Sequence, residues 1–224
     1  DRADLAVALR WGWMNAGSFG QMMGSLHEVA SDGASHYSGG SELTRERLET
    51  WPEPDLQPYL ERYLTGATVA HEAGLLAQFF LLHCFHSAAP GIGMERVCLM
   101  VYDDAELLAD YMAEVERRNR LMVRALLATD IPPDLIIFDS DCAFKNSMMV
   151  SPEDYRALIF GPTEATCALL READIPIMVH TDGKIDGVYP VWLDMGCVAA
   201  HGVEKQANDL AEIKRRFGDR MTLF

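Results

Sequence analysis

The sequence predicts an α/β protein built around a parallel sheet, and two observations support this fold class. Short apolar runs lie at residues 135–138, 175–179 and 198–200, and a polar loop and then a helical pattern follow each of them. The run Leu135–Phe138 has four consecutive apolar residues, which is typical of a strand buried on both faces. Strands that alternate with helices in this way imply parallel strands joined by right-handed crossovers.

The composition fits one large soluble domain and excludes several classes of partner. The chain has 224 residues, 49% of them hydrophobic and 24% charged, with a formal net charge of −15. This charge argues against nucleic acid and anionic membranes as partners. No apolar run approaches the roughly 20 residues of a membrane span, and no signal peptide opens the sequence. Five scattered cysteines predict reduced thiols and a cytoplasmic location: Cys84, Cys98, Cys142, Cys167 and Cys197.

The first half of the chain predicts a mixed lead-in followed by the first units of the sheet. Residues 1–66 are expected to be irregular or helical, and the Gly-, Ser- and His-rich segment 16–40 to form a loop or lid. Residues 67–71 are expected to be a strand and residues 72–85 a buried helix. Residues 104–129 carry an apolar stripe opposite a charged face, which makes them the clearest helix in the chain.

The second half predicts helices over residues 152–172, near 188–195 and near 205–217. Ser151 is a favourable N-cap for the first of these helices, and Pro152 suits its first position. The strands place polar residues at their carboxyl ends, where ligands bind in parallel α/β proteins. These residues are expected to converge on one cleft: Asp139, Ser140 and Asp141 after the first strand, His180 and Asp182 after the second, and His201 and Glu204 after the third.

Several of these segments resemble the uroporphyrinogen decarboxylase superfamily. Phe138-Asp139-Ser140 and Ser151–Tyr155 resemble its "FDS…SP..Y" segment, Asp141–Asn146 resembles the "ED-x-A-Y-K-N" version of one branch, and Val179–Ile185 is similar to the "HSDG-x-I" loop. The superfamily contains decarboxylases and corrinoid-linked methyltransferases. The resemblance implies a (β/α)₈ TIM barrel as a single domain over residues 1–224. The barrel units would then cover residues 67–224, with the C-terminal units incomplete.

The first function that the resemblance implies is acid–base decarboxylation of a tetrapyrrole or a related carboxylated small molecule, without a cofactor. A carboxylate in a low-dielectric cleft can stabilise the cationic intermediate, and a histidine can supply the proton. The expected catalytic residues are Asp141, His180, Asp182 and Ser140, and the expected substrate-binding residues are Asp139, Lys145, Asn146 and Glu204. The arginine-rich element of true decarboxylases is absent, since residues 9–13 do not reproduce it.

Two alternatives remain open from the sequence. One is a metal-dependent methyltransferase that acts with a corrinoid protein, in which His180, Asp182 and Asp141 would hold zinc or another divalent metal. The methyltransferases that resemble this chain have an "H-x-C" loop, and Asp182 replaces its cysteine. The other alternative is a non-catalytic barrel that binds a tetrapyrrole or a corrinoid protein. His71, His83 and His86 are too irregularly spaced for a zinc signature, and the oligomeric state is left open.

Overall fold

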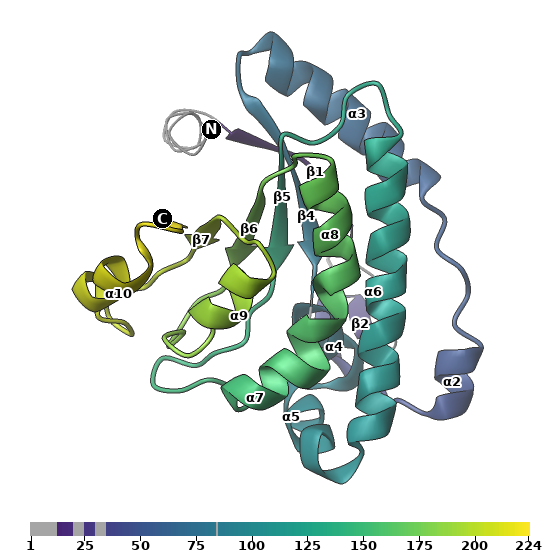
Figure 1. Cartoon of the computed structure of the whole chain (residues 1–224). Helices are drawn as coiled ribbons and strands as arrows, with labels where there is room; N and C mark the ends of the chain where they lie inside the picture. Colours follow the sequence, from purple (N-terminus) through teal and green to yellow (C-terminus); the bar gives the residue numbers. More distant parts are fainter. Residues whose placement is uncertain (1–12, 20–24, 30–34, 84) are drawn as a thin grey trace.

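The protein is described by a computed structural model, which covers residues 13–19, 25–29, 35–83 and 85–224 (Figure 1). Its centre is a six-stranded sheet in the order β1-β4-β5-β6-β7-β8, and every neighbouring pair is parallel. The strands are β1 (Trp13–Phe19), β4 (Leu76–Leu82), β5 (Leu135–Asp139), β6 (Ile177–His180), β7 (Ala199–His201) and β8 (Thr222–Leu223). The predicted α/β class is therefore confirmed, and β5, β6 and β7 are parallel neighbours as expected.

Helices connect the strands and cover one face of the sheet, where α6 and α8 lie side by side (Figure 1). An antiparallel hairpin of β2 (Ser25–Val29) and β3 (Ser35–Gly40) stands apart from the main sheet. The α-helices are α2 (Arg45–Glu49), α3 (Gln57–Glu72), α4 (Phe85–Ile92), α5 (Met94–Asp103), α6 (Ala105–Leu127), α7 (Pro152–Asp154), α8 (Glu164–Glu172), α9 (Tyr189–Asp194) and α10 (Leu210–Phe217). A π-helical turn (Tyr155–Phe160) and a 3₁₀ turn (Gly161–Thr163) join α7 to α8.

Two elements of the first half differ from the sequence prediction. Residues 67–71, expected as a strand, belong to α3, and the expected helix over 72–85 contains β4 instead. A short apolar run fits a buried strand as well as a buried helix, so periodicity alone does not separate them. The sheet also begins earlier than expected, because β1 lies inside the predicted lead-in 1–66 and pairs with β4. Within segment 16–40, the described residues include the hairpin rather than only an irregular loop.

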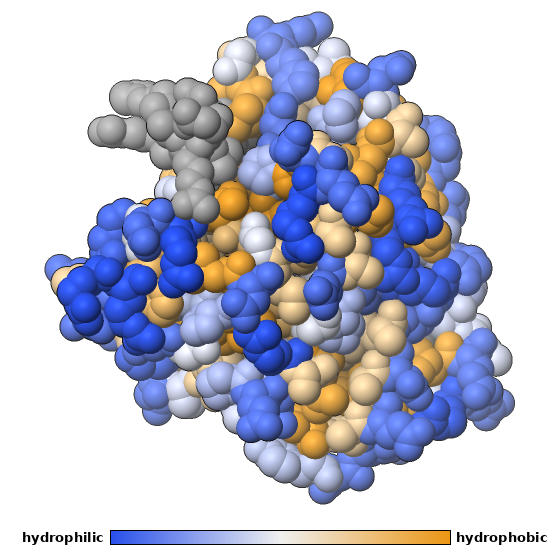
Figure 2. Space-filling model, viewed as in Figure 1, coloured by the Kyte–Doolittle hydropathy of each residue, from blue (hydrophilic) through white to orange (hydrophobic). Residues whose placement is uncertain are grey.

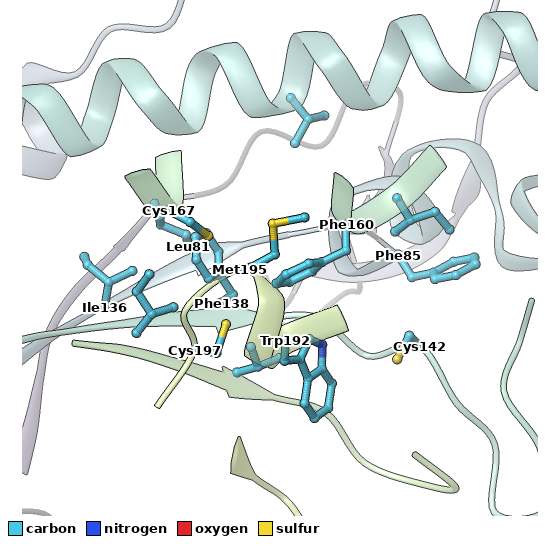
Figure 3. Packing of buried hydrophobic residues seen from close by; sticks show 14 of the residues in the cluster. Leu81, Phe85, Ile136, Phe138, Cys142, Phe160, Cys167, Trp192, Met195 and Cys197 are labelled. Carbon is cyan, nitrogen blue, oxygen red and sulfur yellow. The ribbon is translucent and has the colours of Figure 1, made fainter. Parts of the chain in front are cut away.

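The sheet buries both faces, as its continuous apolar strands predict. Ile136 and Phe138 of β5 belong to the large core cluster beneath the helices, together with Phe160 and Trp192 (Figure 3). The alternating residues of the same strands form a second, smaller cluster on the opposite face, made of Leu135, Ile137, Met178 and Ala199. Successive side chains of a strand point to opposite faces of the sheet. This alternation therefore decides toward which face the side chain at each strand end points.

The outer layer carries the charged residues. Hydrophilic residues are spread over the face shown in Figure 2, with hydrophobic residues in smaller areas between them. Two charged residues of α6 are exceptions among the described residues, since Glu116 and Arg118 are both buried. The Arg118 guanidinium lies 3.8 Å above the Trp51 ring and donates to the Pro52 carbonyl oxygen and to Glu114. This cluster fixes the segment before α3 to α6. No described helix is long and apolar enough to span a membrane, and the four described cysteines are free thiols.

Candidate functional site

Three polar residues stand side by side at the carboxyl ends of neighbouring strands. Asp139 ends β5, His180 ends β6 and His201 ends β7, and the three are register partners across the sheet. Each follows by two residues a member of the small apolar cluster, so strand alternation directs all three toward that face. The predicted convergence of strand-end residues therefore follows from register and alternation alone.

Asp141 and Asp182 extend this row beyond the strands. The Asp141 Oδ1 atom accepts a hydrogen bond from the Asp182 backbone N–H at 3.3 Å and lies 4.0 Å from His180 Nε2. One ligand atom each from Asp141, His180 and Asp182 lies within 4.8 Å of the other two. Asp141 and His180 keep 39% and 24% of their side-chain surface exposed, so the group is open to a small molecule from outside.

His201 orients His180. Their Nδ1 atoms are 2.8 Å apart, which requires one ring to donate a proton to the other. Burial lowers the pKa of His201, the neighbouring His180 lowers it further, and Asp182 partly opposes both effects. A neutral His201 can accept the proton of His180 Nδ1–H, and this leaves the lone pair of His180 Nε2 directed toward Asp141. The sequence placed His201 near the site but could not supply this contact.

Residues that follow β7 make hydrogen bonds to the backbone of the loop that carries Asp182. Asn208 is buried, donates to the Gly183 carbonyl oxygen at 2.7 Å and accepts from the Ile185 N–H at 3.0 Å. Glu204 accepts the Gly183 N–H at 2.8 Å. Gly202 adopts φ +86°, and a Cβ there would lie 2.9 Å from Asp182 Oδ1. Glu204, predicted to bind substrate, thus contacts the loop backbone, and Asn208 is a positioning residue that the sequence analysis missed.

His86, which follows β4 in the chain, also lies at this site. The sequence did not predict that position. Its Nδ1 lies 3.2 Å from Asp139 Oδ1 and 3.8 Å from Asp141 Oδ2, and these three residues form a second group of potential ligands. Contact with Asp139 raises the pKa of His86 despite its partial burial, and the charges of Asp139 and Asp141 add to this. His86 lies in the first turn of α4, directly after β4, so assigning β4 as a strand would have placed it here.

The remaining predicted residues have other surroundings. Ser140 is fully buried and points to the helical face, where its Oγ lies 3.2 Å from the hydroxyl of Tyr155. Lys145 and Asn146 are exposed in the loop after β5. Cys142 is buried in the core, and burial raises the pKa of its thiol to about 12. A neutral thiol in this position is a packing group rather than a ligand.

The other two histidines considered in the sequence have structural surroundings. His83 is buried, its ring makes edge contacts with Phe138 and Phe160, and its Nε2 lies at hydrogen-bonding distance from the Thr163 hydroxyl. Burial lowers the pKa of His83 to about 3, so it is neutral. His71 pairs with Asp134 at 2.7 Å, at the opposite end of β5 from Asp139.

Comparison with known proteins supports the fold. No protein-family model matches the sequence, and no curated protein matches it either. Among solved structures, the chain is similar to a methyltransferase from Methanosarcina mazei, with a TM-score of 0.67 and 15% sequence identity. The match covers 90% of this chain and 59% of the methyltransferase, so the chain spans about three fifths of that protein's length. At this identity the likeness establishes a shared α/β architecture.

Proposed function

We propose that this protein is a divalent-metal-dependent methyltransferase of the superfamily that its motifs resemble. The observation that carries the proposal is the convergence of Asp141, His180 and Asp182, whose ligand atoms lie within 4.8 Å of one another at the carboxyl end of the sheet. The likeness to a methyltransferase fold supports the same class of reaction. The proposal includes a (β/α)₈ barrel, which is supported by the six parallel strands that follow one another in chain order in the main sheet.

The donor set fits a divalent cation. One imidazole nitrogen and two carboxylate oxygens are ligands that zinc accepts, and catalytic zinc sites typically use three protein ligands and keep one position open. The partial exposure of Asp141 and His180 leaves room for such a position. No soft thiolate is available from Cys142, which is buried and neutral. The aspartate at position 182 therefore favours an N/O site over the thiolate site implied by the motif resemblance.

The surrounding residues would prepare this site for methyl transfer. When bound, the ion supplies Lewis acidity, which lowers the pKa of the small-molecule group that accepts the methyl. His201 holds His180 with Nε2 facing the site, and an outer partner of this kind typically contributes about 10–100-fold to metal affinity. Glu204 and Asn208 hold the backbone at Gly183 and so fix the position of Asp182. The methyl donor in this proposal is a corrinoid protein, as the motif resemblance implies.

Metal-free decarboxylation of a tetrapyrrole is the less favoured alternative. The decarboxylase hypothesis requires Ser140 as a catalytic residue. The Ser140 hydroxyl instead lies beside the Tyr155 hydroxyl in the core. The two chemistries differ in their response to chelation. A methylcobalamin-linked methyl-transfer assay on the purified protein should lose activity with a chelator and regain it with Zn²⁺, and Asp141→Asn should prevent the recovery. Methyl transfer that persists after chelation removes all metal would refute the proposal, and decarboxylation of a tetrapyrrole under the same conditions would establish the alternative.

A further inference from the structure

We infer that Asp141 is a bridging carboxylate between two divalent cations, the second of them held by His86 and Asp139. This inference deepens the proposed function and rests on it for the first cation, at His180 and Asp182. The second site was not expected from the sequence. It draws its ligands from the start of α4 and the end of β5, on the other side of Asp141.

The orientation of the Asp141 carboxylate is the first observation. Its Oδ1 faces His180 Nε2 at 4.0 Å, and its Oδ2 faces His86 Nδ1 at 3.8 Å. The two oxygens of one side chain thus serve two different groups of ligand atoms, and in each group the atoms lie within 4.8 Å of one another. Two-metal enzyme sites hold their ions about 3.5–4 Å apart, a spacing that a single carboxylate can span.

The second observation is the state of the two remaining ligand atoms. His86 Nδ1 and Asp139 Oδ1 are both inaccessible to solvent, and neither makes a hydrogen bond of acceptable geometry. They lie 3.2 Å apart, which is a hydrogen-bonding distance, but their relative orientation is unsuitable for one. Buried polar atoms that make no hydrogen bond are costly, and here only the ion-pair contact between the two atoms offsets that cost. A cation between Asp139, His86 and Asp141 would satisfy both atoms at once.

The chemistry of this second group identifies the class of ligand. An imidazole nitrogen with two carboxylate oxygens suits Zn²⁺ and Mn²⁺ rather than a soft monovalent ion. His86 would bind the cation through an unprotonated Nδ1, with the proton of the neutral ring on Nε2. With two cations sharing Asp141, one could hold the methyl acceptor while the other balances the charge that develops beside it. The number of protein ligands, three at each cation, leaves positions open for that acceptor.

Metal stoichiometry on the purified protein tests the inference. The metal-free protein is dialysed against Zn²⁺ and analysed for bound metal, and the same samples are loaded with Mn²⁺ for electron paramagnetic resonance. We expect two equivalents in the wild type, with the broadened signal of two coupled Mn²⁺ ions. His86→Ala and the shape-preserving Asp139→Asn should each bind one equivalent and give an uncoupled signal. His71→Ala is the matched control, because His71 also pairs with an aspartate but at the opposite end of β5.

The outcomes separate this inference from the proposed function. One equivalent in the wild type, lost in His180→Ala but kept in His86→Ala, would overturn the second site and leave the proposed function intact. No bound metal would overturn both. Two equivalents that fall to one in His71→Ala as well as in His86→Ala would attribute the second ion to a surface His–Asp pair and overturn the bridge. Asp141→Asn should weaken both ions by more than about 10–100-fold, the cost of losing only an outer partner.

Discussion

Glu116 in α6 makes the stability of this protein depend on pH in a direction opposite to that of an ordinary carboxylate. Its side chain is buried between α6 and α8, where Oε1 accepts a hydrogen bond from the Thr166 hydroxyl and Oε2 has no hydrogen-bond partner. Burial raises the pKa of Glu116 to about 8, although the Thr166 hydrogen bond and the charge of Arg120 lower it. The folded protein therefore holds a proton here that the unfolded chain releases near the ordinary pKa of a carboxyl group.

The magnitude follows from linkage. A group whose pKa is raised on folding gives its full stabilisation below the pKa of the unfolded state, and this is lost as the pH rises through the folded pKa. Each pKa unit is worth about 1.4 kcal/mol, so the loss between pH 5 and pH 8 is on the order of 3 kcal/mol. Glu116→Gln keeps the shape and the acceptor for Thr166 but cannot ionise. The variant should gain stability relative to the wild type by about this amount as the pH rises.

Urea unfolding at pH 5, 6.5 and 8 measures this difference directly. Glu114→Gln is the matched control on the same helix, because hydrogen bonds from Arg117 lower the pKa of Glu114. Its stabilising charge is present above the ordinary carboxyl pKa, so Glu114→Gln should lose stability relative to the wild type at pH 6.5 and 8. A constant gap between Glu116→Gln and the wild type across this range would refute a protonated Glu116.

Three further predictions concern the site and its scaffold. Gly202→Ala should lower metal affinity by about 10–100-fold, since its Cβ would lie 2.6 Å from the Thr181 carbonyl oxygen and 2.9 Å from Asp182 Oδ1. Gly74→Ala is the control and should leave the affinity unchanged in the same titration, because Gly74 is also at positive φ but nothing lies within 4 Å of the new Cβ. His201→Ala should lower the metal affinity by a similar factor, because the 2.8 Å contact with His180 is lost. If calorimetry gives the variant and the wild type the same affinity, His201 does not position His180. Arg118→Ala should cost about 3–5 kcal/mol in urea unfolding while metal stoichiometry stays the same, and a loss below about 1 kcal/mol would show that the buried cluster at Trp51 is not structural.

The second half of the sheet could be predicted because its strands are unambiguous. The runs before Asp139 and His180 are apolar throughout and end at polar residues, so their register partners could be expected to meet. The same logic failed for β4, whose apolar run was assigned to a helix. His86 was then left without a place at the carboxyl edge, and the second group of ligand atoms was missed.

Side-chain direction was the other source of error. Ser140 follows Asp139 directly, so strand alternation sends it to the opposite face. There its Oγ lies beside the Tyr155 hydroxyl, which also accepts a hydrogen bond from Trp192 Nε1. The face toward which Ser140 points could have been derived from the sequence once the face of Asp139 was chosen. The contact between His180 and His201 could not, because it depends on two side-chain rotations that no sequence pattern specifies.

X-ray absorption at the zinc edge, measured in the His86→Ala background so that one equivalent of Zn²⁺ loads only the His180 site, tests the central claim most directly. Ligation by His180, Asp141 and Asp182 predicts a first shell of only nitrogen and oxygen at about 2.0–2.2 Å, with outer-shell scattering from imidazole. In His180→Ala the imidazole contribution should fall or the ion should be lost. A sulfur shell near about 2.3 Å, or a spectrum that His180→Ala leaves unchanged, would contradict a metal site at the carboxyl ends of β5 and β6.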